Sequence, residues 1–395
     1  MTAGIRSAVA LLACVVAATM AACSHPTVST SSNSWDPKAA AAYLDYRQAW
    51  WMQWPHSARD HDTVCVSCHT GLPYALARPA LRSALAEQGS SANERRLIDG
   101  VIKRVRLGSD VGPYYGEEVG PYKAAESRGT EAVLNALILA SYDAQSGRLT
   151  DDSRTAFASM WDLQQKTGDK KGSWAWLQFD LEPWEASDSG YYGATLAVMA
   201  VGTAPENYAS TPGIQQNLAL LREYLNRESA SQPTINRIFL LWASTKWPGL
   251  LRPEEQQAIV HEILSRQQAD GGWRLASLAW KWHGLNFRSV VKRWFRADGS
   301  PFEGRSDGVA TGLATLVLEE AGVPRDNIQL KRGVSWLLEN QNPKEGCWPA
   351  SSLNKHRDPS SDIGRFMNDA ATAYAVLALT ENQRPANAVA AIASH

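Results

Sequence analysis

The chain has few cysteines, almost no net charge and no apolar run long enough for a good membrane span. Its 395 residues include 5 cysteines, too few for the dense disulfide framework of a small secreted domain. The formal net charge of −1 argues against a nucleic-acid partner, which would need a strongly basic surface. No alternating pattern typical of β-strands persists along the chain. We therefore predict an all-α fold.

The N-terminal residues are typical of a secretory signal. Arg6 precedes a short apolar run at 8–20, and small residues then lead to Cys23. Met20-Ala21-Ala22-Cys23 is similar to a bacterial lipobox, in which the cysteine is acylated. We expect a signal peptide at 1–22, a lipid anchor on Cys23 and a tether over 23–36, with ordinary cleavage near Ala22 as the alternative. The protein would then lie in the bacterial periplasm or cell envelope, attached to a membrane.

The motif most directly tied to chemistry is Cys65-Val66-Ser67-Cys68-His69. At this spacing two thiols can form thioethers to a haem while the adjacent histidine ligates the iron. We predict covalent haem c on Cys65 and Cys68, with His69 as the proximal ligand. A disulfide between the two cysteines or a vestigial motif are the alternatives. A zinc site would need further ligands that the sequence does not offer nearby.

Several residues are candidates for the distal haem ligand. Met367, His356 and His283 fall in long connections, and His61 is close to the motif in sequence. An open sixth position is the alternative, and it would permit ligand chemistry at the iron as well as electron transfer.

Three segments share an ending, so the chain is built from a repeat. Each combines helical periodicity with a glutamine, a glycine and then a tryptophan, at Trp174, Trp273 and Trp348. Each precedes a more apolar segment with small residues three and four apart, as an inner helix requires. We predict outer helices at 38–53, 92–106, 152–166, 212–227, 253–268 and 325–340. Inner helices are expected at 70–87, 129–143, 188–202, 233–245, 307–321 and 368–380.

This repeated ending resembles the QW motif of the squalene–hopene cyclase and protein-prenyltransferase superfamily. The resemblance covers roughly residues 90–382 and implies an (α/α)6 toroid, with outer helices around a ring of inner ones. The glutamine amide would bond free backbone groups at helix ends, and the tryptophan would stack on the neighbouring repeat. The chain then divides into a first helical pair with the haem motif at 37–90, the toroid at 91–382 and a tail at 383–395.

The catalytic motifs of that superfamily are missing. Squalene–hopene cyclases use the central aspartate of D-x-D-D as an acid, and the chain has no such motif. The zinc ligands of the prenyltransferases are also missing, because Cys347 lies inside a QW motif where packing explains it. A shared fold does not confer a shared activity.

Parallel inner helices would bring their N-termini, and His69, to one mouth of the ring. The segment 180–188 adds four carboxylates there, and Glu182 and Glu185 are the candidate catalytic residues. Three other acidic residues at this mouth are more simply explained as helix caps, namely Asp188, Asp307 and Asp369.

The connection from 274 to 306 alternates aromatic and basic residues. As a lid over the mouth, it would let Arg288 or Arg293 pair with haem propionates. Contact with anionic lipid and simple packing on the toroid are the alternatives.

Three classes of function follow from these patterns. The first is an exported c-type haem protein that transfers electrons or catalyses a redox reaction, with a redox partner or a small apolar substrate. If it is an enzyme, it would be an oxidoreductase. The alternatives are a haem-independent isoprenoid- or lipid-handling protein and a carbohydrate-active toroid, whose acidic mouth would cleave sugars.

Overall fold

The computed structural model describes residues 34–279, 295–296, 298–302 and 304–384. The helices and strands described below all belong to the unit Trp35–His395. The predicted signal peptide, Cys23, His283, Arg288 and Arg293 lie outside the described residues. Within the described ranges, no helix has the length and apolar character needed to cross a membrane.

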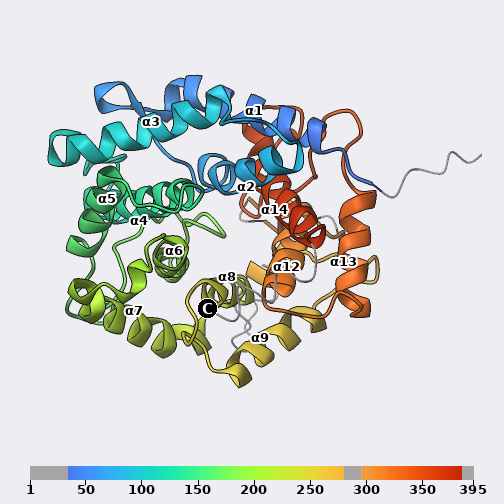
Figure 1. The fold of residues 1–395 in the computed structure, drawn as a ribbon. Coiled ribbons are helices and arrows are strands. Elements are labelled where there is room, and N and C mark those ends of the chain that lie inside the picture. The colour runs from blue at the N-terminus through green and yellow to red at the C-terminus, as the bar shows by residue number, and fades with distance from the viewer. Residues whose placement is uncertain (1–33, 280–294, 297, 303, 385–395) are drawn as a thin grey trace, which may run out of the picture. The chain divides into compact units, whose positions relative to one another are not determined.

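Helices of the unit Trp35–His395 alternate between an inner and an outer layer (Figure 1). The inner layer contains α2 (Gly71–Ala84), α4 (Lys123–Asp143), α6 (Ser189–Thr203), α8 (Thr234–Lys246), α12 (Gly308–Glu320) and α14 (Phe366–Asn382). The outer layer contains α1 (Pro37–Gln53), α3 (Ala92–Leu107), α5 (Asp151–Asp162), α7 (Gln215–Glu228), α9 (Pro253–Ser265) and α13 (Ile328–Glu339). Each inner helix packs on the next, and α14 packs on α2, so the inner layer is a closed ring. The prediction of an all-α toroid of helical pairs is confirmed.

The other described elements are short. They are the antiparallel strands β1 (Ala58–Arg59) and β2 (Thr63–Val64), the helix α10 (Leu275–Ala279) and the 3-10 turns η1 (Pro55–Ser57), η2 (Asp60–Asp62), η3 (Gly108–Asp110), η4 (Tyr208–Ser210), η5 (Pro212–Ile214), η6 (Ser229–Ser231) and η7 (Ile363–Arg365).

The glutamine of the repeated ending makes the same pair of contacts at each of its three occurrences. Its Nε2 donates to the carbonyl of the glycine in its own turn, at 3.1, 2.8 and 2.9 Å. It also donates to a carbonyl at the start of the next outer helix, at 3.0, 2.7 and 2.9 Å. The glutamines are Gln164, Gln267 and Gln341. Each therefore links the turn of its own repeat to the start of the next outer helix through two hydrogen bonds.

The tryptophan of the ending completes this joint. In each case the indole is buried and its Nε1 donates back to a carbonyl near the end of the preceding outer helix, at 2.6, 2.7 and 2.7 Å for Trp174, Trp273 and Trp348. The last joint closes the outer layer, because Gln341 bonds Asp36, the N-cap of α1. A glycine is required there: Gly346 has φ 76°, and a Cβ would lie 2.4 Å from the backbone of Ala39.

Among the inner helices, the predicted starts at residue 129 for α4 and at residue 368 for α14 are wrong, by six and by two residues. The fourth helix, α4, begins at Lys123 rather than near residue 129, because Tyr122 adopts a left-handed conformation and begins the helix without a side-chain cap. Asp369 lies within the first turn of α14 instead of capping it, because the helix already begins at Phe366. Asp307 does cap α12, and its carboxylate accepts from the Ala310 N–H at 3.0 Å.

Candidate functional site

The N-terminal ends of inner helices meet at one end of the ring. The Thr70 hydroxyl, at the N-cap of α2, donates to Asp369 in the first turn of α14 at 2.6 Å. The Asn236 amide, in the first turn of α8, donates to the carbonyl of Asp188, the N-cap of α6, at 3.3 Å. We call this region the N-terminal end of the ring. It contains the predicted haem motif and Glu185.

His69 is held by a chain of hydrogen bonds that fixes its tautomer. Its Nδ1 lies 2.9 Å from the Thr70 hydroxyl, and that hydroxyl gives its proton to Asp369. The Thr70 oxygen must therefore accept the proton of Nδ1–H. Nε2 is left as the atom with a free lone pair, and among the described residues it has no hydrogen-bond partner. Burial, together with the positive charges of Arg47 and Arg357, lowers the pKa of His69 to about 3, so its ring is neutral at pH 7.

Asp369 is the last acceptor in this series of hydrogen bonds, and two further side chains hold it in place. Its Oδ1 accepts from the Tyr43 hydroxyl at 2.9 Å and from Nε of Arg47 at 2.7 Å. Arg47 is fully buried on α1 and also binds Asp362 through both terminal nitrogens. The first outer helix therefore orients His69 indirectly, through a buried ion pair.

Aromatic rings pack around the histidine. The Phe366 ring stacks on His69 with centroids 4.0 Å apart, and Trp51 meets it edge-on at 5.1 Å. Trp51 also donates its Nε1 to the Cys65 carbonyl at 2.7 Å. The Ser67 hydroxyl accepts from the backbone N–H groups of Thr70 and Gly71, at 3.0 and 2.9 Å. The loop that carries the motif is thus held at several points before α2 begins.

Cys65 and Cys68 are free thiols on this loop, 7% and 5% exposed. Cys65 packs with Trp51 and Tyr114, and Cys68 belongs to the main core of the ring. Burial raises the pKa of both thiols, that of Cys65 to about 12. No three His, Cys, Asp or Glu side chains of the described residues are arranged to hold a metal ion directly.

Glu185 lies at the same end of the ring. Its negative charge contributes to the raised pKa of both Cys65 and Cys68. Burial raises the pKa of Glu185 itself to about 7, a shift that Lys123 partly opposes. A carboxyl with a pKa near neutrality can give or take a proton at working pH. Glu182 is held through its backbone. Its N–H donates to Oδ1 of Asn354 at 2.9 Å, and its carbonyl accepts from Nδ2 of Asn354 at 2.8 Å.

The distal-ligand candidates are dispersed. His61 is exposed at the turn between β1 and β2, with its Nδ1 2.9 Å from Asp60. His356 is exposed on the connection between α13 and α14. Met367 is buried next to Phe366 in sequence, the residue that stacks on His69. The identity of the distal ligand stays a prediction.

Several site residues were missed from the sequence. Tyr43, Arg47, Thr70 and Phe366 all act on His69, directly or through Asp369. Thr70 follows the motif immediately, and this adjacency was the one signal available. The other three come from parts of the chain hundreds of residues away from their partners, and no local pattern marks them.

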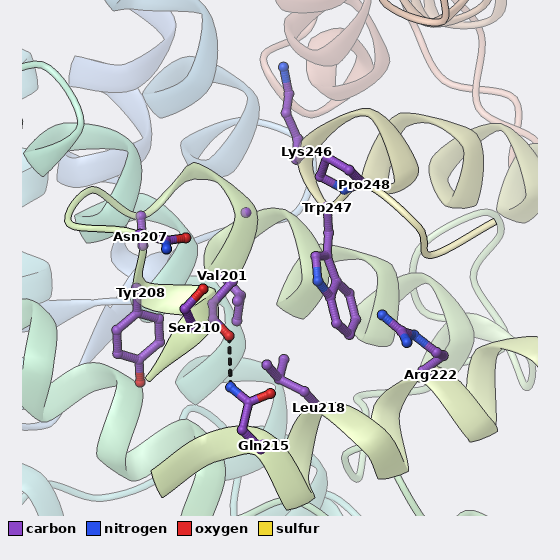
Figure 2. A pocket seen from close by; sticks show the side chains of 13 residues that line it. Val201, Asn207, Tyr208, Ser210, Gln215, Leu218, Arg222, Lys246, Trp247 and Pro248 are labelled. Atoms are coloured by element: carbon purple, nitrogen blue, oxygen red, sulfur yellow. Dashed lines mark hydrogen bonds between the residues drawn. The ribbon is translucent and has the colours of Figure 1, made fainter. Parts of the chain in front are cut away.

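A large cavity lies away from the N-terminal end of the ring, next to the C-terminal ends of the inner helices α6 and α8. Its volume is about 530 Å³, and Figure 2 shows Trp247 and Arg222 on one side and the turn Tyr208–Ser210 on the other. Several of its polar groups already have partners within the fold. Gln215 caps the carbonyls of Ala209 and Thr211, both at 2.9 Å. The cavity is therefore a weaker candidate for chemistry than the N-terminal end, although it is larger.

Three further contacts involve polar groups of this cavity. Trp161 donates its Nε1 to the Tyr208 hydroxyl at 3.0 Å, Lys246 pairs with Glu320, and Arg222 stacks over Trp247 at 4.5 Å.

Comparison with known proteins gives a likeness in fold. No family model matches the chain, and no curated protein matches it. Seventeen chains of solved structures do match, among them three structures of a glycosidase, one of the wild type and two of point variants. They are 12–13% identical to this chain and cover 88% of it and 98% of their own length, with TM-scores of 0.49, 0.47 and 0.48. A likeness this distant carries no argument about activity.

Proposed function

We propose that this protein is a c-type haem protein in which the N-terminal end of the ring holds the haem for electron transfer or a redox reaction. The observation that carries this proposal is the hydrogen-bond chain from His69 Nδ1 through Thr70 to Asp369. A histidine that ligates a metal almost always donates its other ring N–H to an outer partner, which orients the ring. In this chain that donation leaves Nε2 of His69 with a free lone pair. His69 also follows Cys68 directly in the sequence, and Cys65 and Cys68 are both free thiols.

The residues present fit a covalent haem in their chemistry. Cys65 and Cys68 would form the thioethers and His69 would ligate the iron. Trp51 and Phe366 pack against the imidazole and limit the access of water to it. When bound, haem would supply one-electron redox chemistry. An export signal at 1–22 and a lipid on Cys23 belong to the same proposal, because haem is attached to such motifs outside the cytoplasmic membrane.

Exchange of the proximal histidine tests the assignment of His69. The full chain would be expressed with its own N-terminus in a bacterial host that has the haem-attachment machinery. In His69→Ala the absorption spectrum of the haem should show a changed iron ligand field. His261→Ala, which alters an exposed histidine on the outer helix α9, should leave the spectrum unchanged. Equal spectra for wild type and His69→Ala would contradict the proposal.

Glycoside hydrolysis is a second candidate, and Glu185 favours it. A half-buried carboxyl with a pKa of about 7 is suited to act as a general acid on a leaving-group oxygen. Tyr115 and Phe179 pack edge to face at 5.2 Å, and Lys123 lies over the Phe179 ring at 4.5 Å, so aromatic surface is present near the basic partner of Glu185. The glycosidases named above share only a distant likeness in fold, so this activity also stands as a proposal.

Hydrolysis assays separate the two candidates. Purified protein would be incubated with a panel of polysaccharides while the release of reducing ends is followed. If the second candidate is right, Glu185→Gln should lower the rate by about 10²–10⁴-fold, the usual contribution of a general acid. Glu118→Gln, an exposed change of the same kind, should have no such effect. A wild-type protein without hydrolytic activity would remove this candidate.

A further inference from the structure

A second cavity at the N-terminal end of the ring is strongly basic. It lies among the connections that follow α10 and α13, and its volume is about 390 Å³. Its described lining contains five permanent cations, Arg274, Arg296, Arg305, Lys355 and Arg357, and one carboxylate, Asp307. We call this cavity the basic pocket. Such an excess of one charge raises the local concentration of oppositely charged ligands.

Arg296 is a buried cation of the pocket, and hydrogen bonds hold its guanidinium in place. Only 6% of its surface is exposed, and its guanidinium is fixed by the Ser352 carbonyl at 2.9 Å and the Pro301 carbonyl at 2.5 Å. These bonds use Nε and Nη1, and Nη2 has no acceptor among the described residues. The nearby carboxylate of Asp298 is occupied by the N–H groups of Ser300 and His356, at 2.9 and 2.7 Å. Among the described residues, the guanidinium bonds neutral acceptors and lies over the Phe302 ring at 5.0 Å. A buried cation in such surroundings is stabilised when an anion binds beside it.

Three of the other cations form no ion pair with a described residue. They are Arg305, Lys355 and Arg357, and all three are exposed. The single acidic group does not neutralise them, because Asp307 turns its oxygens to the backbone N–H groups of Ala310 and Leu275, at 3.0 and 2.6 Å. The described lining therefore keeps a net positive charge.

The basic pocket lies at the same end of the ring as the histidine of the haem motif. Gly364 and Asn368 line the pocket on either side of Phe366 in sequence, and the Phe366 ring stacks on His69. Arg357, which lines the pocket, is near enough for its charge to act on His69. A ligand in the pocket would therefore place its anionic groups next to the site proposed above.

We propose that the basic pocket binds the carboxylate or phosphate groups of a small anionic ligand held beside His69. Guanidinium groups suit these anions because their planar N–H donors match paired oxygens. The anion can have two sources: the propionates of the haem, which rests on the proposed function, or a free organic anion, which does not.

Binding of simple anions tests the pocket. Citrate and inorganic phosphate would be titrated by calorimetry at low ionic strength into the full chain carrying Cys65→Ala and Cys68→Ala, which cannot hold covalent haem. Adding Arg305→Gln, Lys355→Gln and Arg357→Gln should weaken binding at least about tenfold, because three charges leave the pocket. The matched control changes three exposed cations of the outer helices by the same charge, with Arg96→Gln, Lys103→Gln and Lys331→Gln. It should change binding by less than about twofold.

The outcomes separate the two sources. Citrate that binds the cysteine variant but not the haem-loaded wild type would assign the pocket to the propionates. Citrate that binds both would assign it to a free anion. Binding that persists in a wild type without haem would support the pocket while the proposed function fails. Absence of binding in every form, or equal loss in the pocket and control variants, would overturn the inference.

Discussion

The two ends of the ring of inner helices differ in how their polar groups are used. At the N-terminal end, a histidine is oriented with one nitrogen free, two thiols are unpaired, and a basic pocket keeps a net charge. At the ends of α6 and α8, a larger cavity is lined by groups that cap turns, stack or pair within the fold. The free nitrogen of His69 and the net charge of the basic pocket make the N-terminal end the stronger candidate for chemistry, although the basic pocket is the smaller of the two cavities.

The largest effect on stability is expected at Asp369, which joins α1, α2 and α14 at the N-terminal end. Asp369→Ala removes the acceptor shared by Tyr43, Arg47 and Thr70. Because Arg47 is fully buried but keeps Asp362 as a partner, we expect a loss of about 3 kcal/mol in the free energy of unfolding. Urea denaturation measures it.

The control for this prediction is Asp99→Ala on the exposed face of α3, with a change below about 0.5 kcal/mol. Equal effects of the two variants would mean that the N-terminal end is not held by this network.

The pH dependence of stability compares one carboxyl from each end. Burial raises the pKa of Glu185 to about 7 and that of Glu319, near the end of α12, to about 8, from an ordinary value of 4.5. A carboxyl with a raised pKa binds its proton more tightly when folded. Its contribution to the free energy of unfolding is therefore complete below the pKa of the unfolded state. That contribution is lost as the pH rises through the pKa of the folded state.

Wild-type protein should accordingly lose stability between pH 4.5 and about 8. Glu185→Gln and Glu319→Gln should each remove a part of that loss, on the order of 1–3 kcal/mol. Thermal unfolding on both sides of this pH range checks the prediction, with the exposed Glu339→Gln as control. A rise in stability over the same range would contradict it.

The smallest effect is expected in the larger cavity. Arg222→Gln removes the cation that stacks over Trp247 at 4.5 Å. We expect a loss of about 0.5–1 kcal/mol in stability, with no change in haem content or citrate binding. Chemical denaturation, haem quantification and calorimetry on one preparation measure all three. A fall in haem or citrate binding would show that the two ends are not functionally separate.

The fold was predictable because its signals are local and repeated. The glutamine, glycine and tryptophan of each ending lie within a few residues of one another, and each makes the same contacts. The apolar inner helices were recognisable for the same reason: residues of α12 from Gly308 to Leu318 are all buried, and all of them are apolar or small. The start of α4 was not predictable, because Tyr122 begins the helix through its backbone conformation.

The candidate site was predictable only where it is contiguous. Cys65, Cys68 and His69 form a motif, but Asp369 lies 299 residues from Thr70 and 322 from Arg47. A carboxylate at the start of a helix has the same sequence pattern whether it caps the helix or binds a distant arginine. The cations of the basic pocket are likewise distributed over separate connections, and only the closed ring brings them together.

The most direct test of the account is whether the chain carries covalent haem. Wild type, Cys65→Ala/Cys68→Ala and Cys347→Ala would be expressed with the native N-terminus, denatured, and analysed by haem staining and the reduced pyridine haemochrome spectrum. The account predicts haem on wild type and on Cys347→Ala, whose cysteine is buried in the last repeat joint, and none on the double variant. Wild type without covalent haem, or haem that survives in the double variant, would contradict it.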